Sequence, residues 1–379
     1  MATPPIIALD IGATKVACAI GRLNALAPGF ELLGNSLVPY PIRIESWPCD
    51  PLLIGRTIEQ AIEATAVTGN FAEAHVSLSD PSLRAQVVQA AIELGDEAVH
   101  VRQRDLDRLT ACALNLALGV DRDALLVERL GCSGNGFTNV RNPLGFAATR
   151  LTGTFHIVSM PMTVRRVIVQ AVEAAGLEAA RLTYSLAATA AALDGMGGSR
   201  RTLLIDIGGL AADAGYMADG ALSRSCTVPW GGTTLALDIA RAAQVTVEQA
   251  AVLSLEGLSC RRAEARACLE ARLGSLEQAI KDVLEGQPLP DQALLTGRGA
   301  LIDGIVEWVE RVSGVHASMG RSARTQSVAE LSRQIGLNPA IGVLELATRP
   351  LDAPVVPARQ TRLFGRLLDR TKTILTEYF

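Results

Sequence analysis

Short apolar runs alternate with segments of helical periodicity along the chain, and this pattern predicts a mixed α/β protein. Residues 6–10 read as a buried strand, and a glycine turn separates them from a second strand at residues 16–20. Residues 52–66 carry apolar positions at helical spacing and lead into a strand at 74–78. The same reasoning predicts a helix at 105–117, a strand at 155–159, a helix at 162–175 closed by Gly176, a strand from 203, helical sequence at 246–285, a strand at 292–296 and a helix at 301–312.

One short pattern, an apolar strand followed by Asp-x-Gly, occurs twice. It appears as Asp10-Ile-Gly12 near the start of the chain and as Asp206-Ile-Gly208 in the second half. This recurrence predicts two halves built on one plan, each delivering an aspartate and a glycine turn to a shared cleft.

The residues around the two turns are suited to binding phosphate. A tight turn can point backbone N–H groups and a hydroxyl at an anion, and glycine permits the close approach. A single Asp-x-Gly turn is more often only a turn, and Lys15, one of three lysines in the chain, could be a solvated hairpin residue. The second copy favours the functional interpretation, with no metal ligand or catalytic residue assigned. The candidate nucleotide-binding residues are Asp10, Gly12, Thr14, Lys15, Asp206, Gly208, Gly209, Asp213, Gly231, Gly232, Gly297 and Gly299.

Composition limits the classes of function. A length of 379 residues predicts two or more domains, and 49% hydrophobic residues supply ample core. The net charge of −4 argues against a general nucleic-acid binder. Seven dispersed cysteines without a Cys-x-x-Cys pair favour reduced thiols. We expect no signal peptide and no membrane-spanning segment, so any membrane contact would be peripheral.

The last residues form a basic amphipathic pattern. After a proline-containing segment, residues 362–379 place apolar side chains at steps of three and four, with arginines between them. A terminal helix docked on its own domain is the commoner case. The preceding linker, the terminal position and the charge opposite to that of the whole chain favour a helix lying on an anionic membrane. The predicted membrane-binding residues are Arg362, Leu363, Phe364, Arg366, Leu367, Leu368, Arg370, Ile374, Leu375, Tyr378 and Phe379.

Several segments carry a family resemblance. Residues 9–16, Leu-Asp-Ile-Gly-Ala-Thr-Lys-Val, resemble the first phosphate loop of the actin, heat-shock chaperone and sugar-kinase superfamily. Residues 75–80, 153–160, 174–188 and 228–240 follow in an order that resembles the FtsA family of bacterial cell-division proteins. The resemblance implies an α/β, actin-like (ribonuclease H-like) fold with duplicated domains around a nucleotide cleft, an FtsA-type extra subdomain and a C-terminal amphipathic helix.

The resemblance also implies a division of the chain. The expected parts are a first core domain (1A) at 1–75, 153–198 and 338–348, an inserted subdomain (1C) at 76–152, a second core domain (2A) at 199–245 and 281–337, a shortened helical subdomain (2B) at 246–280, a proline-rich linker at 349–358 and a membrane-targeting helix at 359–379.

The chain departs from the family at the second phosphate loop. The family carries Asp-Ile-Gly-Gly-Gly-Thr-x-Asp, whereas here Leu210, Ala211 and Ala212 replace glycine and hydroxyl-bearing positions. The adenosine turn reads Gly297-Arg-Gly299, and the lysine usual near the adenosine is absent around Val252. Either ATP with Mg²⁺ binds weakly, or the cleft serves as a folding core. Hydrolysis is not expected as the main function.

Three functions remain in competition. The first is a cell-division scaffold that forms filaments with copies of itself, lies on anionic lipids at the cytoplasmic face of the inner membrane, and anchors the tubulin-like FtsZ and other divisome proteins at the division site. The second is a PilM-like pilus or secretion assembly protein, which the terminal helix argues against. The third is a sugar-kinase-type phosphotransferase, which the altered second loop argues against.

Overall fold

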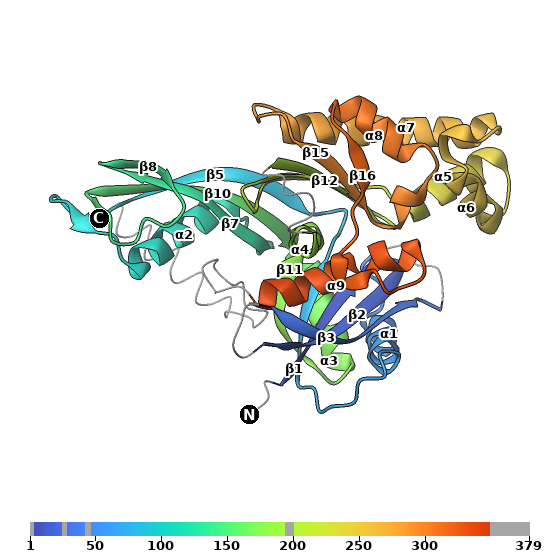
Figure 1. The fold of residues 1–379 in the computed structure, drawn as a ribbon, viewed down its shortest axis with the longest axis horizontal. Helices are drawn as coiled ribbons and strands as arrows, with labels where there is room; N and C mark the ends of the chain where they lie inside the picture. The colour runs from blue at the N-terminus through green and yellow to red at the C-terminus, as the bar shows by residue number, and fades with distance from the viewer. Residues whose placement is uncertain (1–3, 25–28, 42–46, 194–200, 349–379) are drawn as a thin grey trace.

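The computed structural model describes residues 4–24, 29–41, 47–193 and 201–348. In Figure 1 two core units lie one above the other, and a third lobe extends to one side. Each unit is organised around a β-sheet with its own buried apolar cluster. The predicted fold class is confirmed, since two sheets of matching topology face each other across a cleft. The proposed helix at 359–379 and linker at 349–358 lie outside the described residues.

The first core unit is a five-stranded mixed sheet with the strand order β11-β4-β1-β2-β3. Strands β1 and β2 form an antiparallel hairpin, while β1 and β4 run parallel. Nearly every residue of the hairpin is buried, which explains its continuous apolar sequence. The strands are β1 (Pro5–Ile11), β2 (Lys15–Leu23), β3 (Phe30–Pro39), β4 (Glu73–Leu78) and β11 (Glu178–Tyr184).

Helices cover this first sheet. Asp50 caps the first of them by accepting a hydrogen bond from the N–H of Leu52, and a proline occupies the first turn. Two others lie between the core units in Figure 1, where they pack against each other and against strands of both sheets. The helices on the outer face are α1 (Pro51–Glu63) and α3 (Met162–Ala174), and those between the units are α4 (Ser185–Ala192) and α9 (Leu331–Thr348).

The second core unit repeats the plan of the first. Its sheet has the order β14-β13-β12-β15-β16, so β12 and β13 correspond to the hairpin β1 and β2, and β15 is parallel to β12 as β4 is to β1. The strands are β12 (Arg201–Ile207), β13 (Ala212–Ala218), β14 (Ala221–Val228), β15 (Gln292–Thr296) and β16 (Ala317–Met319). The helices are α5 (Gly232–Ala243), α6 (Val247–Leu255), α7 (Ala263–Leu284) and α8 (Ile305–Ser313).

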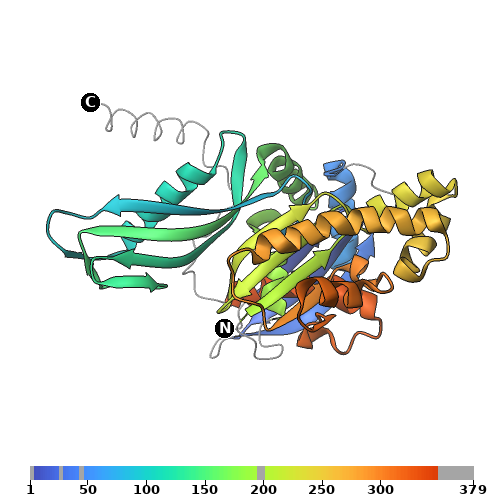
Figure 2. The same ribbon diagram turned by 90° about the horizontal axis from the view of Figure 1, so that it is seen from above.

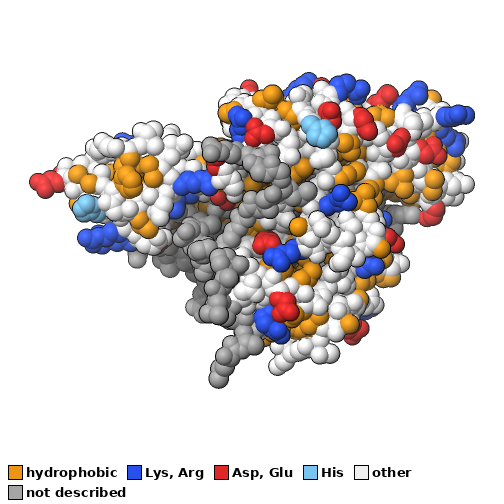
Figure 3. All heavy atoms as spheres, in the orientation of Figure 1, with side chains coloured by type: hydrophobic (Ala, Val, Ile, Leu, Met, Phe, Trp, Pro, Cys, Tyr) orange, Lys and Arg blue, Asp and Glu red, His pale blue; other side chains and the backbone are white. Residues whose placement is uncertain are grey.

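The lobe at the side of the molecule is a separate four-stranded antiparallel sheet with one helix on it, seen clearly in Figure 2. Figure 3 shows several hydrophobic side chains on one face of this lobe. The sheet consists of β5 (Arg84–Glu93), β10 (Arg150–Pro161), β7 (Arg122–Gly134) and β8 (Phe137–Val140), and the helix is α2 (Gln103–Ala117). The short strands β6 (Val99–His100) and β9 (Ala147–Ala148) pair with each other in a small sheet of their own.

One predicted element is wrong in its boundaries. The helix expected at 301–312 begins only at Ile305, because residues Arg298–Leu301 form a 3₁₀ turn after the glycine at 297. The helical sequence predicted at 246–285 is present but is divided by a 3₁₀ turn at Gly257–Ser259. In the part of the chain that the structure describes, no helix is both long and apolar enough to cross a bilayer.

Candidate nucleotide cleft

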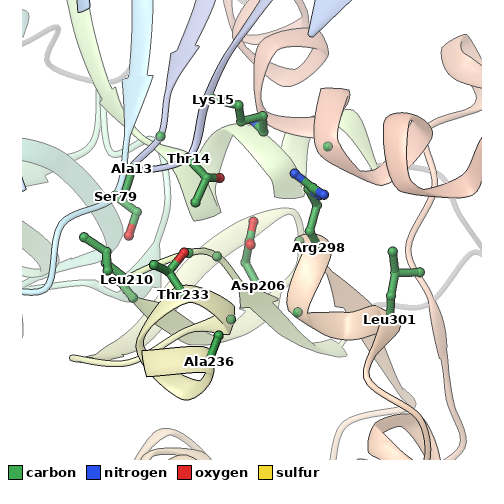
Figure 4. Close-up of a pocket in the computed structure, with 18 of the residues that line it drawn as sticks. Ala13, Thr14, Lys15, Ser79, Asp206, Leu210, Thr233, Ala236, Arg298 and Leu301 are labelled. Carbon is green, nitrogen blue, oxygen red and sulfur yellow. The ribbon is translucent and has the colours of Figure 1, made fainter. Parts of the chain in front are cut away.

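A cavity of about 620 Å³ lies between the two core units, and both Asp-x-Gly turns open onto it (Figure 4). Its volume lies within the range usual for small-molecule sites. The lining brings together eleven of the twelve predicted nucleotide-binding residues. They are Asp10, Gly12, Thr14, Lys15, Asp206, Gly208, Gly209, Asp213, Gly232, Gly297 and Gly299, that is, all but Gly231 of the predicted set.

 Gly231 directly precedes Gly232, at the start of α5.

The first turn is held closed by its own backbone and by a buried ion pair. The N–H of Gly12 donates to the carbonyl of Lys15 at 3.0 Å. The ammonium of Lys15 donates to Oδ2 of Asp10 at 2.7 Å, and both side chains are at least nine-tenths buried. The other oxygen of Asp10 accepts hydrogen bonds from Ser77 at 3.0 Å and Ser185 at 2.9 Å. Both carboxylate oxygens of Asp10 are therefore engaged within the protein.

The second turn has the same backbone and different side chains. The N–H of Gly208 donates to the carbonyl of Ala211 at 2.9 Å, as Gly12 does to Lys15. Leu210 and Ala211 are buried at the cavity wall and carry no side-chain hydrogen-bond donor. The second turn thus presents less polar chemistry to a ligand than the first.

Asp213 is held by hydroxyl groups from both halves of the molecule. Its oxygens accept hydrogen bonds from Ser79 at 2.5 Å, Tyr184 at 2.8 Å and Thr227 at 2.5 Å. Burial raises the pKa of Asp213 above its ordinary value, and the three hydroxyl donors act in the opposite direction. Because Ser79 and Tyr184 come from the first half, Asp213 also links the two core units across the cleft.

Asp206 is the third carboxylate at the cavity. Burial raises its pKa to about 7, and the negative charges of Asp213 and Asp10 add to the effect, while Lys15 lowers it. Gly297, with φ of 76°, lies directly against it, so that a Cβ at this position would collide with the carboxylate. The carboxyl group of Asp206 is consequently divided between its neutral and charged forms near neutral pH.

The glycine turn before α5 uses its amides within the protein. The N–H of Gly232 donates to the carbonyl of Gly208, and that of Thr233 donates to the carbonyl of Gly209, each at 2.9 Å. A Cβ at Gly231 would meet the backbone of Gly208 and Gly209. These amides hold the second turn in place, so they are not open donors for an anion, and a ligand contact at Gly231 and Gly232 stays a prediction.

The cavity fits a nucleotide by size, but its carboxylates do not form a ready site for Mg²⁺. At nucleotide sites Mg²⁺ is usually held by one or two carboxylates together with water and the phosphates of the ligand. Both oxygens of Asp10 and of Asp213 already accept hydrogen bonds. Within the described ranges, no cluster of three or more acidic, histidine or cysteine side chains is placed to hold a metal ion. The residues that would hold a nucleotide are those of the two turns, and a metal ion at Asp10 or Asp213 would have to displace a hydrogen-bond donor already in place.

The sequence did not indicate which groups hold the aspartates. Ser79, Tyr184 and Thr227 come from three distant segments, and only the fold brings them to Asp213. One sequence signal points to such groups, namely the serines at 77 and 79 at the end of a predicted strand. Alternate residues of a strand share a face, so both hydroxyls are expected on one side of the sheet. The predicted membrane-binding residues at 362–379 lie outside the described part of the chain.

The duplicated sheets, the paired turns and the cleft between them define a protein with the actin-like ATPase fold. A solved PilM–PilN type IV pilus biogenesis complex has a chain of similar fold, with a TM-score of 0.67 and 13% sequence identity over 91% of this chain and 99% of that chain.

Within this class, the sequence is similar to the cell division protein FtsA. Residues 81–159 match the family described as the SHS2 domain inserted in FtsA. The chain is 22% identical to cell division protein FtsA of Neisseria meningitidis serogroup B over 384 aligned residues, which cover 91% of this chain and 90% of that protein. It is also 22% identical to FtsA of Borreliella burgdorferi, over 89% of this chain and 90% of that protein. The chain is thus similar to FtsA over most of its length, and the resemblance stated from the sequence is confirmed.

Proposed function

We propose that the chain is a cell-division scaffold that forms filaments on the cytoplasmic face of the inner membrane, anchors FtsZ and recruits other divisome proteins. The observation that carries this proposal is the SHS2 domain at residues 81–159, which interrupts an actin-like core. Alignment with FtsA proteins over nine-tenths of the chain supports the same function.

Attachment to the membrane is assigned to residues 359–379. Their sequence combines an apolar stripe with Arg362, Arg366 and Arg370, and Asp369 and Glu377 are the acidic residues among them. Such a helix would bury its apolar face at the acyl boundary, while each cation near an anionic surface contributes about 1 kcal/mol. The linker at 349–358 would separate this helix from the actin-like core.

The division into subdomains is part of the proposal. We assign residues 76–152 to subdomain 1C and residues 246–280 to a shortened 2B, with the two core domains as given above. In this arrangement the cleft holds a nucleotide weakly, through the turns at Asp10–Lys15 and Asp206–Asp213, and it stabilises the scaffold more than it serves catalysis.

Flotation with liposomes tests the membrane attachment. The intact chain is expected to float with vesicles that contain anionic lipid, and a chain lacking residues 359–379 is expected to remain at the bottom of the gradient. The double change Phe364→Glu and Leu367→Glu should have the same effect, because it places charge on the apolar face. Leu289→Glu is the matched control, since Leu289 is 62% exposed on the core and should tolerate the charge. Undiminished flotation of the truncated chain would contradict the assignment.

The two alternative functions have weaker support. The likeness to PilM is one of fold, at 13% identity, whereas the likeness to FtsA is in the sequence over nearly the whole chain. A sugar-kinase activity would need a free catalytic aspartate, and Asp213 is instead occupied by three hydroxyl groups. Adding purified FtsZ to the flotation separates the scaffold from both alternatives, because only the scaffold is expected to bring FtsZ to the vesicles.

A further inference from the structure

Arg298 stands at the mouth of the cavity, on the 3₁₀ turn Arg298–Leu301 that follows β15. In Figure 4 its guanidinium points into the cavity, toward the space between Lys15 and Asp206. Its side chain is exposed, and within the described part of the chain it makes no ion pair or side-chain hydrogen bond. It therefore presents an uncommitted positive charge to the cleft.

The packing of the turn explains why the side chain at 298 enters the cavity. Gly297 lies against Asp206, and a Cβ at Gly299 would collide with the side chain of Ile207. The two glycines thus press the backbone of the turn onto the end of β12. The side chain of residue 298, between the two glycines, extends into the cavity (Figure 4).

The charges around the cavity make Arg298 distinctive. The cations among the lining residues are Lys15 and Arg298, and Lys15 is already paired with Asp10 at 2.7 Å. Asp213 is held by three hydroxyl groups. Arg298 is consequently the cation of the lining that is available to pair with an anionic ligand. Asp10 and Asp213 already accept hydrogen bonds within the protein, so neither has an oxygen free for a metal ion.

Apolar side chains in the same lining suit the apolar part of such a ligand. Ala251, Ile302, Ile335 and Pro339 line the cavity and come from α6, the segment after the 3₁₀ turn, and α9. A ligand with a flat, weakly polar group and a phosphate matches a lining that combines apolar side chains with an exposed arginine.

We propose that Arg298 binds the phosphate of a nucleotide in this cleft and supplies the counter-charge that a divalent cation would otherwise supply, so that binding does not require the metal. A guanidinium can donate two parallel hydrogen bonds to a phosphate, which an ammonium cannot. This inference rests on the proposal that the cleft binds a nucleotide.

Titration calorimetry on the full chain tests the proposal with ADP, ATP and adenosine, each in EDTA and in millimolar Mg²⁺. We expect ADP to bind with equal affinity in both buffers. Arg298→Ala should weaken ADP binding about tenfold or more, and the affinity of Arg298→Lys for ADP should lie between those of Arg298→Ala and the wild type. The affinity for adenosine should be unchanged in both variants. Arg311→Ala, at an exposed arginine of α8 outside the cavity, is the matched control.

Three results would overturn the proposal. They are a requirement for Mg²⁺ in ADP binding by the wild type, an equal loss of ADP and adenosine binding in Arg298→Ala, and no heat from ADP or adenosine with the wild-type chain at millimolar concentration. None of these results changes the outcome expected in the flotation experiment. Failure of the Arg298 proposal is therefore distinguishable from failure of the proposed membrane scaffold.

Discussion

The two Asp-x-Gly turns share a backbone but differ in what their side chains do. Strand register places Asp10 opposite Ala17 in the first hairpin and Asp206 opposite Asp213 in the second. Each turn closes with one N–H to carbonyl hydrogen bond, at 3.0 Å in the first and 2.9 Å in the second. By this register Lys15 corresponds to Ala211. The first turn therefore holds its own cation, and the second has none.

This difference shows that the geometry and the chemistry of a phosphate turn are separable. The glycines, the register and the buried strands fix the path of the chain in both halves. The side chains that meet a ligand can then change without loss of the fold. Leu210 illustrates this, since it is buried at the cavity wall where the corresponding residue of the first turn is Thr14.

The largest expected effect on stability comes from removing the charge of Lys15, the residue that makes the first turn differ from the second. Lys15→Met removes the cation from Asp10 and leaves a buried carboxylate with only its two serine donors. Removal of one partner of a buried ion pair costs about 3–5 kcal/mol, so we expect the free energy of unfolding to fall by this amount. Urea denaturation followed by circular dichroism measures it.

Lys281→Met is the control for this change. Lys281 pairs with Glu277 on the surface of α7, with 62% and 39% of the two side chains exposed. Exposed pairs of this kind contribute about 0.3–0.5 kcal/mol, so Lys281→Met should lower the free energy of unfolding very little. Equal losses in the two variants would show that the Asp10–Lys15 pair does not stabilise the first turn.

The sequence predicted much of the fold because the relevant signals are local. The apolar strands at 6–10 and 16–20 and the glycine turn between them need only neighbouring residues, and the structure confirms both strands. The repeated Asp-x-Gly pattern also revealed the duplication, since a shared plan shows in the sequence of each half. The late start of α8 was missed because the 3₁₀ turn at 298–301 depends on how its glycines pack onto β12.

The partners of the candidate site residues could not be predicted in the same way. Tyr184 lies 29 residues from Asp213, and Ser79 lies 134 residues from it. No periodicity joins such positions, and only the packing of the two core units does. The sequence therefore identified the aspartates at the cleft without showing that hydroxyl groups already occupy two of them.

A smaller loss of stability is expected from changes at Asp213, which is bound by hydroxyl groups, whereas Asp10 is bound by a lysine. Tyr184→Phe removes a donor at 2.8 Å from a carboxylate, at a fully buried position. Hydrogen bonds to charged groups are worth about 1.5–3 kcal/mol, and the free energy of unfolding should fall by that range. Tyr216→Phe is the matched control, because its hydroxyl donates to the neutral carbonyl of Pro288 and should be worth about 1 kcal/mol. A loss no larger than in the control would mean that Asp213 does not depend on this hydroxyl.

The smallest effect concerns Asp206, which has no lysine of its own turn beside it. Its pKa is raised from 3.8 to about 7 by burial and by Asp213 and Asp10, so the folded protein holds this proton more tightly than the unfolded chain. As the pH rises from about 4 to 7, the unfolded chain ionises first and the folded state loses stability, after which the difference is constant. Asp206→Asn cannot ionise, so its gain over the wild type should be larger at pH 8 than at pH 5, by about 1–2 kcal/mol once partial exposure to the cavity is allowed for. Urea denaturation at the two pH values measures this gain, with Asp96→Asn, at an exposed position, as the control. A gain that is equal at both pH values, or larger at pH 5, would show that Asp206 is charged in the folded protein and that the second turn is less desolvated than its geometry indicates.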